Sequence, residues 1–309
     1  MNVSVNSYFS GAGLMDYGLM KAGIEINRAY EIDEKACRTY RHNFGDKISQ
    51  CDIGDKLALD EPECDGMVFT YPCNKYSNSA SIHNQRTGDE LFLHALRHVA
   101  LNVPNFYAIE NVPGMKRFAV TMEAMTKLPD YYVQVFCPIE SSLWLPQKRS
   151  RLIIVGTLNP FTVRPPKNHK PITLAECLER DVEINHDEAV HKRLAGAKGY
   201  RDAPIISDPA RGDIAPCVLA HYKKDRSTRL VVDKNSDIGV RSYTAREMAR
   251  LQGLPDSFEF PVTERQALEQ IGNGVSVPVA EWIGREMNRY MGADKTANPF
   301  KELLQGVVL

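Results

Sequence analysis

The sequence predicts an α/β fold built on a parallel sheet and joined to a smaller, irregular part. Over roughly the first half of the chain, short apolar runs alternate with stretches at helical spacing, which is typical of successive β/α units. From about Pro160 to Gly239, prolines, charges and short irregular runs replace that alternation. With 309 residues, the chain is long enough for one large domain or for two unequal ones.

The composition is that of a soluble globular protein, with 43% hydrophobic residues, 25% charged residues and a net charge of −1. This charge disfavours binding that depends on bulk positive charge but allows a local basic face. Seven cysteines without a Cys-x-x-Cys pair fit a reducing compartment, and fit neither a zinc site nor a disulfide framework. Because the chain shows neither a signal-peptide pattern nor an apolar run of ~18 residues, we expect a cytoplasmic protein without a metal or a membrane contact.

The first unit is a strand over residues 3–9, followed at once by Phe9-Ser10-Gly11-Ala12-Gly13 and a helix that begins at Leu14. Two glycines separated by one residue let the backbone turn tightly and approach a ligand, and the amides of the helix start face the same place. The pattern is weak by itself, because a tight turn alone would explain it.

The next two units each place an acid after a strand. The strand over residues 24–31 ends in Glu31, about twenty residues past the glycine turn, where a carboxylate accepts hydrogen bonds from a ribose diol. A helix over Glu34 to Phe44 and a strand near Ser49 lead to Asp52. Asp52 is suited to accept from an adenine amino group, and is equally well explained as a solvated loop acid.

The fourth strand, Met67 to Phe69, ends before Pro72, and the next residue is Cys73. A thiol at the carboxyl end of a strand, before the long polar loop 74–88, lies where open α/β sheets bind ligands. The alternative is a buried structural cysteine. A helix from Glu90 to Leu101 follows.

The fifth strand begins at Phe106, is apolar throughout and ends in Glu110-Asn111. Burial disfavours the charged form of an acid, so the pKa of Glu110 should be raised and the group could deliver a proton near neutral pH. A helix-capping or salt-bridged glutamate is the alternative.

Two further strands, Tyr131 to Cys137 and Arg151 to Val155, are expected to form a hairpin. On a strand, Gln147, Arg149 and Arg151 would point to one face. Two guanidinium groups on one face need anions or polar acceptors, which indicates substrate contacts. A charged edge strand that resists aggregation is the alternative.

The irregular part contains a basic segment, residues 221–229, whose hydroxyls and cations fit a phosphate-facing loop or, equally, a solvated one. Thr244 and Glu247 predict a capping box for a helix that ends at Gly253. A glycine-flanked turn, 272–274, then precedes an amphipathic helix over 279–290.

Taken in order, these motifs resemble those of the DNA (cytosine-5) methyltransferase family, and the likeness spans nearly the whole chain. Each motif is short, but six in order at sensible separations are highly specific. They are Phe-x-Gly-x-Gly (Phe9–Gly13), Pro-Cys (Pro72–Cys73), Glu-Asn-Val (Glu110–Val112), Gln-x-Arg-x-Arg (Gln147–Arg151), Arg-Leu-Gln-Gly (Arg250–Gly253) and Gly-Asn-x-Val (Gly272–Val275).

The resemblance implies a Rossmann-like methyltransferase domain over 1–164, a mostly-β target-recognition domain over 165–260, and a C-terminal segment over 261–309 that returns to the first domain. It also implies S-adenosylmethionine as cofactor, a flipped cytosine of double-stranded DNA as substrate, and a monomer. The implied cofactor residues are Phe9, Ser10, Gly11, Gly13, Glu31, Ile32, Asp52, Ile53, Pro72, Leu91, Asn273 and Val275.

By the same resemblance, Cys73 is the nucleophile and Glu110 acts on the base at N3. Arg151, supported by Arg149, contacts the base and the acid, and Asn111 holds the Pro-Cys backbone. The implied DNA contacts are Ser77, Ser79, Arg86, Gln147, Lys223, Lys224, Arg226 and Arg229.

Three residues depart from the family pattern: Leu14 replaces a third glycine, Tyr71 stands before Pro-Cys, and Asn74 replaces the usual glutamine. The Tyr71 and Asn74 changes would narrow the base pocket, alter the substrate, or have no effect. The competing hypotheses are a tRNA cytosine-5 methyltransferase, although its Cys-Phe-Thr signature is missing, a non-catalytic DNA-binding regulator with the same fold, and transfer of a larger group.

Overall fold

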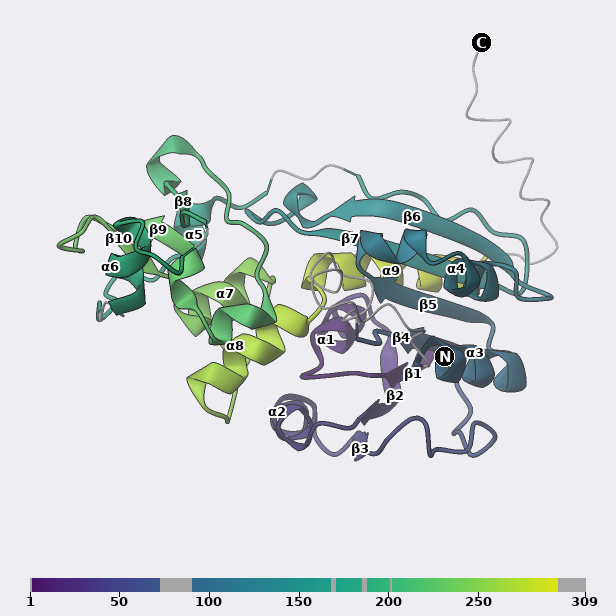
Figure 1. Ribbon diagram of the computed structural model, residues 1–309. Helices are drawn as coiled ribbons and strands as arrows, with labels where there is room; N and C mark the ends of the chain where they lie inside the picture. The colour runs from purple at the N-terminus through teal and green to yellow at the C-terminus, as the bar shows by residue number, and fades with distance from the viewer. Residues whose placement is uncertain (1, 73–90, 168–170, 185–187, 201, 294–309) are drawn as a thin grey trace, which may run out of the picture.

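The computed structural model describes residues 2–72, 91–167, 171–184, 188–200 and 202–293, which form a large part around one sheet and a smaller part beside it (Figure 1). In the large sheet the strand order is β3-β2-β1-β4-β5-β7-β6. Strands β1 to β5 run parallel, and β7 runs antiparallel to both β5 and β6. The strands are β1 (Ser4–Tyr8), β2 (Glu25–Glu31), β3 (Ile48–Gln50), β4 (Gly66–Phe69), β5 (Phe106–Asn111), β6 (Tyr132–Glu140) and β7 (Ser150–Thr157).

Helices cover both faces of this sheet because its central strands are apolar on both sides. On β5, Phe106 and Ala108 belong to one hydrophobic cluster, whereas Tyr107 and Ile109 belong to another. The first cluster is closed by α1 (Leu14–Lys21), α2 (Glu34–Phe44) and α9 (Val277–Met291), and the second by α3 (Leu91–Asn102) and α4 (Ala119–Thr126). Continuous apolar runs with both faces covered are the expected form of a buried parallel sheet.

The C-terminal helix α9 returns to the large sheet and packs closely on α1. A Cβ atom added at Gly18 would lie 2.5 Å from Ala280 Cβ, and one at Gly284 would lie 2.7 Å from Ala22 Cβ. Each helix therefore places a glycine where the other approaches. The sequence predicted the helix over 279–290 but contained no signal for these two contacts.

The smaller part combines a sheet of order β10-β9-β8 with short helices. Helix α8 (Glu264–Asn273) packs against it, since a Cβ atom added at Gly272 would lie 2.1 Å from the Ala220 amide nitrogen. The segment is irregular as expected, but helices accompany its three described strands. Its elements are α5 (Leu174–Cys177), α6 (Glu188–Leu194), β8 (Ile205–Ser207), β9 (Arg229–Val232), β10 (Val240–Ser242) and α7 (Ala245–Leu251).

Most of the expected elements are present, including the Thr244 and Glu247 capping box that begins α7. The expected hairpin differs at one point that matters for the site. Strand β7 begins at Ser150, so Gln147 and Arg149 precede it and do not share a strand face with Arg151. Gln147 forms only an isolated bridge, with Ala215 of the smaller part.

We predict that Gly18→Val lowers the free energy of unfolding by about 2 kcal/mol or more, because the added side chain would separate α1 from α9. Gly292→Ala is the control, since a Cβ atom there would be 3.4 Å from the Asn288 carbonyl oxygen. Urea denaturation of both variants measures the effect. Equal stability of Gly18→Val and wild type would contradict close packing of the two helices.

Candidate functional site

The centre of the candidate site is an ion pair between neighbouring strand ends. Glu110 lies near the end of β5, and Arg151 follows the first residue of β7, which runs antiparallel beside it. Arg151 Nε lies 2.7 Å from Glu110 Oε1, with side-chain exposures of 11% and 9%. Glu110 is therefore a salt-bridged glutamate, which was the alternative left open by the sequence. A nearly buried carboxylate held by one guanidinium group has a fixed position at this strand end.

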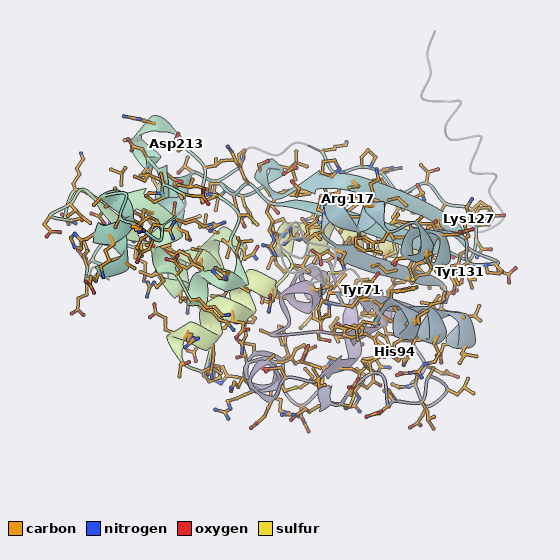
Figure 2. All side chains as sticks on the ribbon, in the orientation of Figure 1. Tyr71, His94, Arg117, Lys127, Tyr131 and Asp213 are labelled. Atoms are coloured by element: carbon orange, nitrogen blue, oxygen red, sulfur yellow. The ribbon has the colours of Figure 1, made fainter. Side chains whose placement is uncertain are left out.

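Asn111, the last residue of β5, connects the end of this strand to the chain that follows β4. Its Nδ2 donates to the Tyr71 carbonyl oxygen at 3.1 Å, while its Oδ1 accepts from the Val112 amide at 2.8 Å. Tyr71 is the second residue after β4, and Pro72 is exposed beside it. Figure 2 shows Tyr71 at the end of the large sheet nearer the smaller part, with Lys127 and Tyr131 toward the other end.

The expected nucleophile Cys73 lies outside the described residues. Ser77, Ser79 and Arg86, the DNA contacts expected in the same polar loop, also lie outside them. The described structure therefore shows two features next to Pro72: the Asn111 bond to the residue before it, and the Glu110–Arg151 pair on β5 and β7.

The glycine turn after β1 is held by the end of β2. The Ser10 amide donates to the Tyr30 carbonyl oxygen at 3.0 Å, and the Gly11 amide donates to Glu31 Oε2 at 2.8 Å. Phe9, Gly11 and Gly13 all have positive φ, with values of 58°, 56° and 90°. We call residues 9–13 the glycine loop. A Cβ atom added at Gly11 would meet no atom within 4 Å, so the loop borders open space.

The groups around this space fit a nucleoside-bearing cofactor. Ile32, which follows Glu31, is 61% exposed, so its apolar side chain is available to a flat ligand. Asp52 lies just past β3 and accepts from the Gly54 amide at 2.8 Å, while Ile53 is buried. A cavity of about 910 Å³ is lined by Asp52, Cys51 and Tyr30 among others, but by none of residues 9–13, Glu31 or Ile32.

The remaining expected cofactor residues come from two other segments. Leu91 is half-buried at the start of α3, and Asn273 is exposed at the end of α8. Val275 is buried in the core beneath the large sheet. A Cβ atom added at Gly274 would lie 2.3 Å from Leu14 Cδ2, so the turn after α8 lies directly against the start of α1.

A family model described as C-5 cytosine-specific DNA methylase matches residues 3–289. The chain belongs to this family. It is a DNA methyltransferase that modifies cytosine at C5.

Curated relatives and solved structures agree with the family. The type II methyltransferase M.NgoBI of Neisseria gonorrhoeae is 32% identical, with 88% of this chain and 89% of the relative covered. M1.ScrFI of Lactococcus lactis subsp. cremoris is 29% identical, with 83% and 70% covered. The structure of the Entamoeba histolytica methyltransferase EhMeth matches with a TM-score of 0.78 at 18% identity, covering 95% of this chain and 100% of that one. The structure of the S. pombe Dnmt2 methyltransferase matches with a TM-score of 0.76 at 21% identity, covering 94% of this chain and 100% of that one. At these identities the two structures show the fold alone.

The structure gives Gln147 of this methyltransferase a buried role in place of the DNA contact expected from the sequence. The side chain is fully buried. Its Nε2 donates to the Leu251 carbonyl oxygen at 2.7 Å, and its Oε1 accepts from the Val218 amide at 2.9 Å. The expected strand face is wrong, because the residue lies before β7, and its full burial disfavours the DNA contact that the resemblance implies.

Arg149 is also buried and does not join the Glu110–Arg151 pair. Its Nη1 donates to the Val218 carbonyl oxygen at 2.7 Å, and its Nη2 donates to those of Gly272 and Gly274 at 3.2 and 2.5 Å. Burial, followed by the nearby charge of Arg151, lowers the pKa of Arg149 to about 10, so it stays charged at neutral pH. The Arg149 side chain binds backbone carbonyls and does not contact the Arg151 side chain. Any support that it gives Arg151 comes from fixing the backbone two residues before it.

Three of the four basic residues of segment 221–229 that were expected to face DNA have partners on α8 or in the smaller part. Lys223 pairs with Glu269, and Arg226 pairs with Glu264 at 3.1 Å. Arg229 Nε donates to the Cys217 carbonyl oxygen at 3.0 Å. Lys224 is exposed and forms no ion pair among the described residues. Of the four, Lys224 is the one whose charge is most available to a phosphate.

A buried carboxyl beneath the glycine loop escaped the sequence analysis. Asp16 of α1 accepts from Ser7 Oγ at 2.6 Å and from Tyr40 OH at 2.7 Å, and Ser7 in turn accepts from Ser10 Oγ at 2.9 Å. Burial raises the pKa of Asp16 to about 6, although the bonds from Ser7 and Tyr40 oppose the shift. Nothing in the sequence around Asp16 distinguishes it from an exposed helical acid.

The described helices include none with the length and apolarity to cross a bilayer. Within the same residues, no group of three or more His, Cys, Asp or Glu side chains is arranged to hold a metal ion.

We predict that Asp16 makes stability depend on pH. The raised folded pKa favours the protonated form, so its contribution is complete below pH 3.8 and is lost as pH rises to about 6 and above. That shift corresponds to about 3 kcal/mol. Asp16→Asn lacks this loss, so its unfolding free energy relative to wild type should improve by about that amount between pH 4 and pH 7. Urea titrations across this range measure it, and a pH-independent difference would contradict the prediction.

We predict that Gln147→Ala lowers the free energy of unfolding by about 1–3 kcal/mol, because the Val218 amide and the Leu251 carbonyl would be left buried without this partner. Chemical denaturation and DNA binding should be measured on the same preparation. If the variant kept wild-type stability but bound DNA more weakly, the result would contradict the buried role and favour the DNA contact expected from the sequence.

Proposed function

We propose that this methyltransferase takes its methyl group from S-adenosylmethionine and delivers it to a cytosine flipped out of double-stranded DNA, through a covalent bond between Cys73 and C6 of the base. The observation that carries the proposal is that the end of β5 is hydrogen-bonded to the chain two residues before Cys73. Asn111 bonds the backbone just before Pro72, and the Glu110–Arg151 pair lies on β5 and β7.

The chemistry requires a nucleophile because C5 of cytosine is too weak to take a methyl group unaided. Addition of the Cys73 thiolate to C6 moves electron density to C5, which divides one difficult step into two easier ones. Once C5 carries the methyl group, the C5 proton passes to water, and departure of the thiolate restores the aromatic base. Both electrons of the C6–S bond return to sulfur, so the enzyme is regenerated.

Glu110 would protonate or hydrogen-bond N3 of the cytosine, which draws charge from the ring as the thiolate adds. Arg151 would hold Glu110 in place and contact the base O2, and its positive charge would stabilise the negative charge that develops there. The distance of 2.7 Å between Arg151 Nε and Glu110 Oε1 supports this assignment, because it shows that both side chains lie together where β5 ends and β7 begins.

S-adenosylmethionine, when bound, supplies an electrophilic methyl group and is left as S-adenosylhomocysteine. The glycine loop would receive its methionine end, and Glu31 would accept hydrogen bonds from the ribose. Ile32 would stack on the adenine, and Asp52 with Ile53 would contact its edge. Supporting observations are the open space over Gly11 and the exposed Ile32 side chain.

The cytosine must leave the duplex to reach this site, at a cost of a few kcal/mol. We assign backbone contacts to Ser77, Ser79, Arg86 and Lys224, and sequence recognition to the domain over 165–260. The expected division into 1–164, 165–260 and 261–309 and a cytoplasmic monomer belong to the same proposal. The packing of α9 on α1 supports the return of the last segment to the first domain.

The test is transfer of labelled methyl groups from S-adenosylmethionine to unmethylated genomic DNA, followed by mapping of the modified cytosines. We expect wild type to label DNA, Cys73→Ala to give no label, and Glu110→Gln to lose at least about 100-fold in rate, the scale of general acid–base catalysis. Arg285→Ala, an exposed change on α9, is the control. Undiminished labelling by Cys73→Ala would refute the nucleophile, and labelling of tRNA in place of DNA would refute the substrate.

A further inference from the structure

We propose that Thr70 and Tyr71 are positioning residues that join the glycine loop to the Pro72 turn, so that binding in the loop and placement of the turn influence each other. The inference rests on the proposed function, because it takes the glycine loop as the cofactor site and Cys73, next after Pro72, as the nucleophile.

The glycine loop has a conformation that needs support from its neighbours. Phe9 has a φ of 58°, in the left-handed region that a bulky side chain rarely adopts. Such strained residues persist only when the surrounding structure holds them, and they gather at functional sites. Whatever holds Phe9 therefore sets the shape of the loop.

Thr70 provides the first support. Its amide donates to the Tyr8 carbonyl oxygen at 3.2 Å, which extends the pairing of β1 with β4 by one residue. Its Oγ1 then donates to the next carbonyl, that of Phe9, at 2.8 Å. The hydroxyl thus holds the backbone of the strained residue from the chain segment that leads to Pro72.

Tyr71 provides the second support and links a third segment. Its ring lies edge-on to that of Phe9, with centroids 6.1 Å apart, and its hydroxyl donates to Met115 Sδ at 3.6 Å. Its carbonyl oxygen accepts from Asn111. The side chain is buried, so the residue that departs from the family pattern serves as packing between Phe9 and Met115.

These contacts couple the conformation of the glycine loop to the position of the backbone at Pro72. A change in the Phe9 conformation on cofactor binding would move Thr70 and Tyr71, which contact it. A shift of the backbone at Pro72 would in turn move Phe9 through the same two residues. Because Thr70 and Tyr71 contact both Phe9 and the strand end at Asn111, a break in the link should weaken both cofactor binding and methyl transfer.

The primary test is Thr70→Val, which removes the hydroxyl and keeps the shape. Two quantities are measured: the dissociation constant for S-adenosylhomocysteine by calorimetry, and the single-turnover rate of methyl transfer at saturating S-adenosylmethionine and DNA. We expect the constant to rise and the saturated rate to fall, each by about 3- to 10-fold, the scale of one lost hydrogen bond. Thr70→Ser restores the hydroxyl and should return both values to within about twofold of wild type.

Thr126→Val is the matched control, because Thr126 Oγ1 also donates to a backbone carbonyl, that of Met122, at 2.6 Å, on the remote helix α4. It should change neither quantity. Tyr71→Leu, compared with Tyr71→Phe, gives a second route to the link if Thr70→Val folds poorly. Leucine removes the ring that packs on Phe9 and should affect both quantities, whereas phenylalanine keeps the ring and should affect them less.

An effect of Thr70→Val on binding alone, on the saturated rate alone, or on neither would overturn the proposal. So would an equal effect of Thr126→Val, which would indicate general destabilisation. The proposed function is tested separately in the same assay, since it fails only if wild type shows no Cys73-dependent labelling of DNA.

Discussion

The arrangement of the site depends on a buried positive charge that carbonyl oxygens stabilise. Arg149 binds the carbonyls of Val218, Gly272 and Gly274, so one guanidinium group joins the chain before β7, the smaller part and the turn after α8. A charge removed from water is costly unless it is well partnered. Here the last carbonyls of α8 supply the negative end of a helix dipole, which favours a cation at that position.

This constraint reaches the site through the chain itself. Ser150 begins β7 directly after Arg149, and Arg151 then points to Glu110. The two arginines of one short motif therefore have different partners: Arg149 binds backbone carbonyls, and Arg151 pairs with Glu110. The neighbouring Gln147 strengthens the same junction by bonding Val218 and Leu251.

The sequence was informative wherever a local pattern determines a local structure. The glycine loop, the acids after β2 and β3, the Glu110–Asn111 strand end and the capping box of α7 all follow from residues close together in the chain. The sequence did not indicate which distant residues these side chains contact. A period-of-two argument placed Gln147, Arg149 and Arg151 on one face, but β7 begins at Ser150, and what buries Gln147 and Arg149 lies some seventy or more residues away. The close contact of α1 with α9 through Gly18 and Gly284 is equally non-local.

The departure at Leu14 shows how distant parts of the chain accommodate each other. A side chain at this point in the glycine motif needs space, and Gly274 provides it, since any Cβ there would collide with Leu14. The glycine loop is thus held by Glu31 from β2, by Thr70 from the end of β4, by Ser7 and Asp16 from below, and by the turn after α8 through Leu14. A loop restrained from four directions has little conformational freedom left to lose, so a ligand that fits it meets a small ordering cost. Arg149 and Leu14, the residue that follows the glycine loop, both contact the turn after α8, so one short turn joins the chain before β7 to the start of α1.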